Sequence, residues 1–260
     1  MRDIGYSTVT ELPNERVPEE QLKRITERYY WASKHVDNKD VLECACGAGQ
    51  GAAILNFSAN SYTAGDYDEE IVNIAQNNYN GEIDFHIFDA CNSPFNDNQF
   101  DIVLICEAIY YIPDIERFLD EAWRILRPGG RVMIVTANSS LFDFNRSPYT
   151  YTYPDVLIMS KLFDKHKFIF VSAEGGTSLS GTNIRQKILR PLKFVASRLH
   201  MIPKTMLGKA WLKKVFFGGN SVRMPEKISS KLSGVKLPKS ISKNKNDKDH
   251  KVLYFIGEKF

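Results

Sequence analysis

The stretch that most constrains the fold of this chain is residues 41–51, VLECACGAGQG. It begins as a short apolar run, contains the acidic residue Glu43, and then turns through Gly47 and Gly49. The apolar residues from Ala52 onward read as the start of a helix. Strand, glycine turn and helix in this order form the opening unit of a nucleotide-binding α/β sheet. Glycines there permit positive φ and close approach of a ligand, and the following helix N-terminus directs free N–H groups toward it.

The glycine turn by itself is compatible with three interpretations. Gly47, Gly49 and Ala52 fit the loose pattern of dinucleotide-binding folds. An ordinary turn between a strand and a helix, without any ligand, is a second interpretation. The acid four residues before Gly-x-Gly resembles motif I of the class I S-adenosylmethionine-dependent methyltransferases, in which the loop wraps the methionine part of the cofactor. That resemblance implies S-adenosylmethionine as the cofactor, held in part by Glu43, Ala45, Gly47 and Gly49.

Two further acids follow predicted strands. The strand at 61–65 ends at Asp66, where a carboxylate accepts hydrogen bonds from ribose hydroxyls in this architecture. The alternative for Asp66 is capping of the next helix, but Asp68 is already placed for that role. The strand at 83–88 ends at Asp89-Ala90, which resembles the methyltransferase position that contacts the adenine amino group. Tyr67, together with Glu107 after the fourth strand, completes the expected cofactor-binding set.

The segment from Phe118 to Val135, FLDEAWRILRPGGRVMIV, strengthens the resemblance. It is similar to the helix, turn and strand that follow the fourth strand of these methyltransferases, and dinucleotide-binding folds have no matching requirement. The resemblance covers roughly residues 28–171 and returns at the last strand. It implies an α/β fold with a Rossmann-like seven-stranded sheet and helices on both faces.

We expect one methyltransferase domain over residues 1–260, with a basic helical and loop insertion at 174–250. Besides the strands already named, we expect strands at 102–106, 131–136 and 168–173 and a final antiparallel strand at 250–258. We expect helices at 19–36, 114–126 and 154–165. Within the first of these, Arg28 and Tyr29 are expected to pack on the sheet, with contact to the cofactor as the alternative.

The chemistry should lie at the ends of the fourth and fifth strands, beside the expected sulfonium. Glu107 follows the fourth strand, and it can orient the acceptor, serve as a base or contact the cofactor. Tyr110 and Tyr111 are candidates for lining the acceptor pocket or for packing in the core. The polar and aromatic loop at 138–153 leaves the fifth strand, where open α/β sheets bind substrates. No His, Asp or Glu cluster has the spacing of metal ligands, so we expect no metal.

The acceptor is the least specific part of this interpretation. The strings ERYYWA, CEAIYYIPD and FNRSPYTYTYP resemble methyltransferases associated with glycan and polysaccharide biosynthesis. They imply a small-molecule or glycan acceptor, methylated at a sugar hydroxyl or amino group. The alternatives are a lipid or quinone methyltransferase at a membrane surface, and a non-catalytic S-adenosylmethionine-binding partner subunit.

The charge distribution is uneven. Residues 184–251 contain 18 Lys/Arg and 3 Asp/Glu, although the whole chain has a net charge of only +3. With its apolar residues, the part at 184–217 suits either a structural cap or peripheral contact with an anionic membrane. Nucleic-acid binding is the less favoured use of this charge. The N-terminal residues lack an apolar signal core, and the four cysteines fall in or beside apolar segments, so we expect a cytoplasmic protein with buried, reduced thiols. Peripheral attachment to the inner face of the membrane is the alternative.

Overall fold

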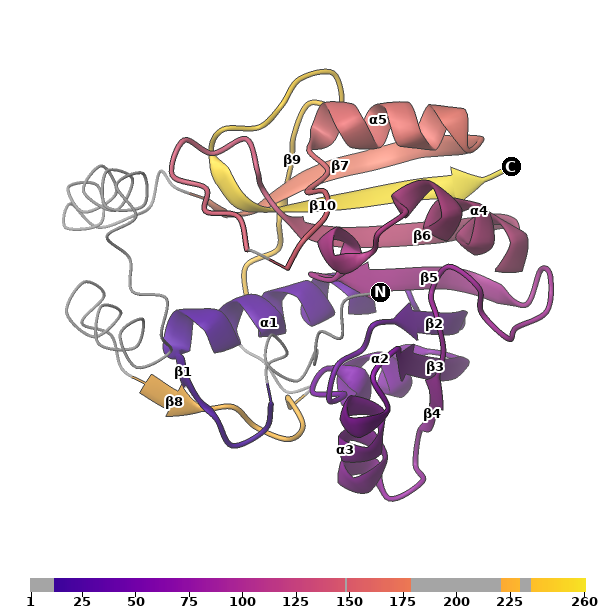
Figure 1. Ribbon diagram of the computed structural model, residues 1–260, viewed down its shortest axis with the longest axis vertical. Coiled ribbons are helices and arrows are strands. Elements are labelled where there is room, and N and C mark those ends of the chain that lie inside the picture. The colour runs from indigo at the N-terminus through magenta and orange to yellow at the C-terminus, as the bar shows by residue number, and fades with distance from the viewer. Residues whose placement is uncertain (1–11, 148, 179–220, 230–234) are drawn as a thin grey trace.

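The computed structural model describes residues 12–147, 149–178, 221–229 and 235–260. Within them, a central sheet has eight strands in the order β4-β3-β2-β5-β6-β10-β7-β9, shown in Figure 1. Its strands are β2 (Asp40–Cys44), β3 (Ser61–Asp66), β4 (Asp84–Ile87), β5 (Phe100–Cys106), β6 (Leu126–Ala137), β7 (Phe168–Ser178), β9 (Lys239–Ser240) and β10 (His250–Lys259). The helices are α1 (Glu19–Ser33), α2 (Ala52–Ser58), α3 (Glu69–Tyr79), α4 (Ile115–Ile125) and α5 (Val156–Lys165), with a 3-10 turn η2 (Ile109–Tyr111).

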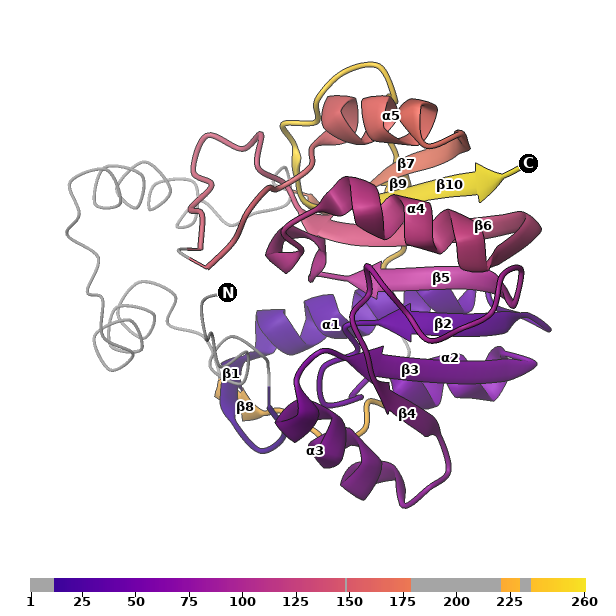
Figure 2. The same cartoon turned by 45° about the vertical axis from the view of Figure 1, so that its right-hand side comes forward.

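The central strands are apolar on both faces because helices cover both faces. In β5, Ile102 and Leu104 enter the core cluster that also holds side chains of α1, α2 and α3. The alternate residues Val103 and Ile105 enter a second cluster with side chains of α4 and α5. Figures 1 and 2 show the sheet between these two helical layers. The continuous apolar run in the sequence therefore marks a strand buried on both sides.

The topology confirms the predicted Rossmann-like methyltransferase sheet. Strands β4, β3, β2, β5 and β6 pair in parallel, whereas β10 runs antiparallel between β6 and β7. The one departure from seven strands is β9, a two-residue edge strand that pairs with Glu174 and Gly175 of β7. The last strand of the chain thus lies inside the sheet and not at its edge.

Two strand boundaries differ most from the sequence prediction. β6 begins at Leu126 and not at Arg131, because Leu126 pairs with Phe100 across a bulge. Arg127 holds this early part by ion pairs with Asp40 at 2.9 Å and Asp101 at 3.0 Å. β7 continues past residue 173 to Ser178, since β10 and β9 supply partners for the extra residues.

The described parts of the predicted insertion pack on the domain. Strand β8 (Ser221–Arg223) pairs antiparallel with β1 (Arg16–Pro18) in a separate two-stranded sheet. The next residues bury Met224 and Ile228, and the Ile228 amide donates to the Gln50 carbonyl at 2.8 Å. The predicted basic helical part at 184–217 lies outside the described residues. Among those that are described, no helix combines the length and apolar character needed to cross a membrane.

Near the end of the chain, Lys259 is a buried cation that joins three elements. Its Nζ donates to the carbonyls of Trp123 at 2.7 Å and Leu126 at 2.6 Å, and to Asn98 Oδ1 at 2.9 Å. It also lies 4.0 Å from the centroid of the Trp123 ring. Burial lowers the pKa of Lys259, while Asp97 opposes that shift. The last strand is therefore attached to the C-terminal end of α4, where the helix dipole favours a positive charge.

We predict that Lys259→Met lowers the free energy of unfolding by about 2 kcal/mol, because buried carbonyls at the end of α4 lose their donor. The measurement is urea denaturation at neutral pH, with Lys39→Met as the control, since Lys39 is an exposed lysine. Equal stabilities of the two variants would show that the Lys259 contacts contribute nothing net.

Candidate functional site

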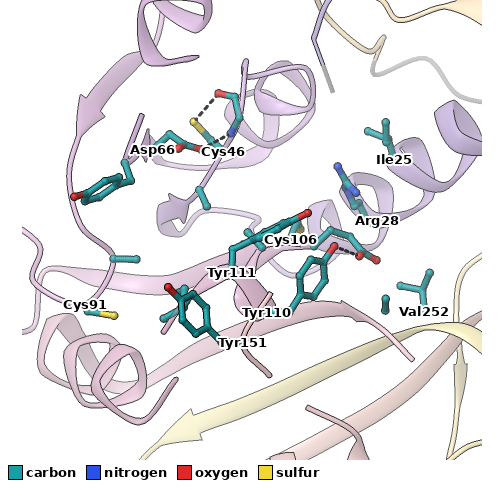
Figure 3. A pocket seen from close by; sticks show the side chains of 18 of the residues that line it. Ile25, Arg28, Cys46, Asp66, Cys91, Cys106, Tyr110, Tyr111, Tyr151 and Val252 are labelled. Carbon is teal, nitrogen blue, oxygen red and sulfur yellow. Dashed lines mark hydrogen bonds between the residues drawn. The ribbon is translucent and has the colours of Figure 1, made fainter. Parts of the chain in front are cut away.

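A cavity of about 630 Å³ opens at the carboxyl ends of the parallel strands, where α/β sheets bind ligands. Figure 3 shows side chains around it that come from α1, the strand ends and the loop after β6. Seven of the nine predicted cofactor-binding residues line it, together with both predicted tyrosines. These lining residues are Ala45, Gly47, Asp66, Tyr67, Asp89, Ala90, Glu107, Tyr110 and Tyr111. Glu43 and Gly49 are the two predicted residues that do not line it.

The glycine turn has the left-handed backbone that its sequence predicts. Gly47 has φ 59° and Gly49 has φ 75°, which L side chains rarely adopt. Ala45 also has a positive φ of 53°, although a left-handed alanine costs roughly 1 kcal/mol or more. A Cβ atom on Gly49 would lie 3.0 Å from the Phe85 ring, so Gly49 serves close packing below the turn and not the cavity wall.

Asp66, at the end of β3, fixes the turn from the side. Its Oδ2 accepts the Gly47 amide at 3.1 Å, and its Oδ1 accepts the Asp68 amide at 3.2 Å. Burial raises the pKa of Asp66, while these backbone hydrogen bonds lower it. A carboxylate has about four lone-pair sites, so further acceptor capacity is directed at the cavity. Asp68 separately caps α3 by accepting the Glu70 amide at 3.0 Å, as predicted.

Glu43 requires a correction to the predicted direct contact with a cofactor. Its side chain is only 1% exposed and points toward α1, on the face opposite to its neighbours Leu42 and Cys44. Its Oε1 accepts the hydroxyl of Tyr29 at 2.7 Å, and its Oε2 accepts the hydroxyl of Tyr62. Glu43 therefore supports the turn from beneath, because Tyr29 and Tyr62 cover its carboxyl group.

Burial raises the pKa of Glu43 to about 7, although the two tyrosine hydrogen bonds and Arg28 oppose the shift. Between pH 4.5 and about 7, the native state therefore holds a proton that the unfolded state has lost. The contribution of Glu43 to the free energy of unfolding is fully present below pH 4.5 and is lost as the pH rises through about 7.

We predict that Glu43→Gln flattens this pH dependence. Between pH 4.5 and pH 7, the wild-type protein should lose about 3 kcal/mol more stability than the variant. The measurement is chemical denaturation of both proteins across that range. Subtracting the free energy of unfolding of the variant from that of the wild-type protein at each pH removes the contributions of histidines and other carboxylates. Parallel curves would mean that Glu43 is ionised throughout.

The end of the cavity where the sequence predicts the acceptor lies beyond β5 and β6. Glu107 accepts the Tyr110 hydroxyl at 2.8 Å, the contact drawn in Figure 3. Tyr111 and Tyr151 add two more rings to this wall, and Tyr151 comes from the predicted loop at 138–153. Burial raises the pKa of Tyr110 well above its usual value, with Glu107 as the second cause, so Tyr110 stays a neutral donor.

Sequence reasoning found only part of one wall of the cavity, since it named Arg28 and Tyr29 of α1 and gave contact with the cofactor as the alternative to packing. Gln21, Arg24, Ile25 and Arg28 of α1 all line the cavity. Their spacing places them on one helical face, next to the buried stripe, and this periodicity was the available signal. Arg28 therefore reaches the cavity, and Tyr29 lines it as well, although most of its ring is buried. Lys251 and Val252 of β10 also line the cavity, and no local pattern marks them.

The cysteines are free thiols, as expected, but Cys91 is partly exposed where burial was predicted. Cys46 and Cys106 line the cavity, and burial raises the pKa of each thiol well above its usual value. Because the thiolate is the nucleophile and the metal ligand, these side chains suit packing better than chemistry. Among the described residues, no group of three or more His, Cys, Asp or Glu is placed to hold a metal ion.

Comparison with known proteins agrees with this geometry. Residues 42–134 match the family model described as a methyltransferase domain. The matched segment runs from β2 into β6, and the sheet order is the one expected for a class I methyltransferase. A solved S-adenosylmethionine-dependent methyltransferase from Thermotoga maritima, titled a possible histamine N-methyltransferase, superimposes with a TM-score of 0.59. It covers 92% of each chain at 16% identity, so it shows the fold alone.

Two curated relatives are more similar in sequence. Phthiotriol/phenolphthiotriol dimycocerosates methyltransferase 1 of Mycobacterium ulcerans is 40% identical over 110 residues, which are 40% of this chain and 41% of that protein. The fatty-acid O-methyltransferase of Mycolicibacterium smegmatis is 35% identical over 124 residues, 45% of each protein. The chain thus spans less than half the length of these relatives.

Proposed function

We propose that this protein is an S-adenosylmethionine-dependent methyltransferase acting on a small, lipid-like acceptor. The observation that carries the proposal is one cavity with two different ends. Gly47 and Asp66, joined by a 3.1 Å hydrogen bond, lie at one end, and Glu107 with its tyrosines lies at the other. The match of residues 42–134 to a methyltransferase domain supports the same reaction.

The residues present fit the cofactor. Ala45 and Gly47 present a left-handed backbone to the cavity, and Asp66 offers a carboxylate for the ribose hydroxyls. Asp89 and Ala90 are available for the adenine, and Arg28 supplies a positive charge near the methionine end. When bound, S-adenosylmethionine supplies an activated methyl group, so the protein has mainly to bind and orient two molecules.

Aromatic and apolar side chains form part of the cavity wall near Glu107. These are Tyr110, Tyr111, Tyr151, Ile112 and Val252. The names of the relatives contain a phthiotriol and a fatty acid, and both are lipids. These two points support a lipid acceptor, the alternative that the sequence left open. The glycan acceptor stays a prediction without support from the named relatives, as does contact of residues 184–217 with a membrane.

We predict that Asp66→Ala weakens binding of S-adenosylhomocysteine by about 10- to 100-fold, because hydrogen bonds to a charged group contribute roughly 1.5–3 kcal/mol each. The measurement is titration calorimetry, with Asp37→Ala as the control, since Asp37 is exposed and does not line the cavity. NADH is titrated in parallel. Binding of NADH without binding of the adenosyl ligand would make the site a dinucleotide site.

We predict that methyl label from S-adenosylmethionine enters a long-chain lipid acceptor and not a nucleoside-diphosphate sugar. A long-chain alcohol, a fatty acid and the sugar nucleotide are compared under the same conditions by mass spectrometry. Transfer to the sugar alone would restore the glycan prediction. Tight binding of S-adenosylhomocysteine without turnover on any acceptor would favour the non-catalytic partner subunit.

A further inference from the structure

Glu107 has a strained backbone at the acceptor end of the cavity. Its φ is 54°, in the left-handed region that non-glycine residues rarely adopt. Such a conformation costs of the order of 1–3 kcal/mol and persists only where surrounding contacts impose it. Here the Glu107 amide donates to the Val135 carbonyl at 2.7 Å, which continues the pairing of β5 with β6 and holds the Glu107 backbone in place. The half-buried side chain lines the cavity as a result.

A stack of rings holds the hydrogen-bond donor of Glu107. The Tyr110 hydroxyl donates to Glu107 Oε2 at 2.8 Å, and the Tyr110 ring lies 4.3 Å from that of Tyr153 at an interplanar angle of 24°. Tyr153 in turn makes an edge contact with Phe144 at 4.7 Å. Because Tyr110 is buried, its ring has little freedom once Tyr153 is in place.

The loop that carries Tyr153 is attached to the same site through its backbone. The Tyr151 amide donates to the Tyr110 carbonyl at 2.8 Å. Arg146 donates from one nitrogen to the carbonyls of Thr150, at 2.8 Å, and Tyr151. The Ser139 hydroxyl donates to the Tyr153 carbonyl at 3.2 Å. These hydrogen bonds therefore join the loop that carries Tyr151 and Tyr153 to η2, beside the Glu107 carboxylate.

We propose that Glu107 is the general base of this site, that Tyr110 and Tyr153 are its positioning residues, and that the group methylated is a hydroxyl. The proposal rests on the proposed methyltransferase function and names the acceptor chemistry of the same site. Tyr110 engages Oε2, and Oε1 is the oxygen assigned to the acceptor. The charged or titratable groups around Glu107 are Arg28 of α1, Cys106 of β5, Tyr110 and Tyr111 of η2, and Tyr254 of β10.

The path of the proton and the electron pairs favours a hydroxyl group as the acceptor. The acceptor O–H bond breaks as its proton passes to Glu107 Oε1, and the oxygen electron pair forms the new O–CH₃ bond. The S–CH₃ bond breaks with its electrons left on sulfur, which gives neutral S-adenosylhomocysteine, and Glu107 then releases its proton to water. A fatty-acid carboxylate needs no base and would be repelled by a second carboxylate beside it.

The test compares Tyr110→Phe, Tyr153→Ala and Tyr153→Phe with the wild-type protein. The ¹³C carboxyl signal of Glu107, assigned with Glu107→Gln, is followed by NMR across pH in the complex with S-adenosylhomocysteine. Loss of the Tyr110 donor, or of the ring that holds it, should move the midpoint of this signal up by roughly one pH unit. Tyr153→Phe keeps the stacked ring and should restore the wild-type midpoint.

Kinetics with a long-chain alcohol complete the test. The acid limb of the rate profile should move with the NMR midpoint, and Glu107→Gln should lower kcat by at least 100-fold while affinity for S-adenosylhomocysteine stays within about twofold. Two outcomes with transfer to the alcohol would overturn this inference and leave the methyltransferase function intact. In the first, the NMR midpoints of the tyrosine variants equal that of the wild-type protein; in the second, Glu107→Gln retains the wild-type kcat. Tight cofactor binding with no turnover on any acceptor would overturn both.

Discussion

The hydrogen bonds from Tyr29 and Tyr62 to the Glu43 carboxylate join α1, β2 and β3 beneath the glycine turn. A buried acid without such partners would cost several kcal/mol, so all three elements must be in place before it is accommodated. The Tyr29 ring also fills the space next to Gly51, where a Cβ atom would lie only 2.2 Å from it. The turn thus rests on α1, and its left-handed backbone is fixed before any ligand arrives.

That support has a consequence for binding. The Gly47 amide reaches Asp66 across the gap between β2 and β3, and the carboxylate keeps one orientation because Asp68 binds its other oxygen. A ligand that meets groups already oriented loses less free energy to ordering them. The cofactor end is therefore built from strand ends and backbone hydrogen bonds, which move little.

The acceptor end is assembled differently. Its rings come from η2 and from the loop that carries Tyr151 and Tyr153. Within this loop, Arg146 donates hydrogen bonds to the carbonyls of Thr150 and Tyr151. The methyltransferase-domain match covers residues 42–134, so it includes Glu107 but neither α1 nor this loop. The cavity wall around Glu107 is thus shared between the matched segment, which supplies η2, and elements outside it, which supply Tyr151 and Val252.

The sequence by itself determined the sheet, the glycine turn, the cap at Asp68 and the acids at strand ends, because each depends on local periodicity or on a short motif. It also placed Glu107 and both tyrosines after β5, where the cavity opens. Only the tertiary structure showed that Glu43 faces Tyr29 and Tyr62, that Arg24 and Arg28 line the cavity, and that Tyr153 stacks on Tyr110. The physical reason is that residue spacing along one helix or strand indicates which of its side chains are buried. The partner of a buried polar group or ring comes from another helix, strand or loop, and the packing of these elements decides which partner that is.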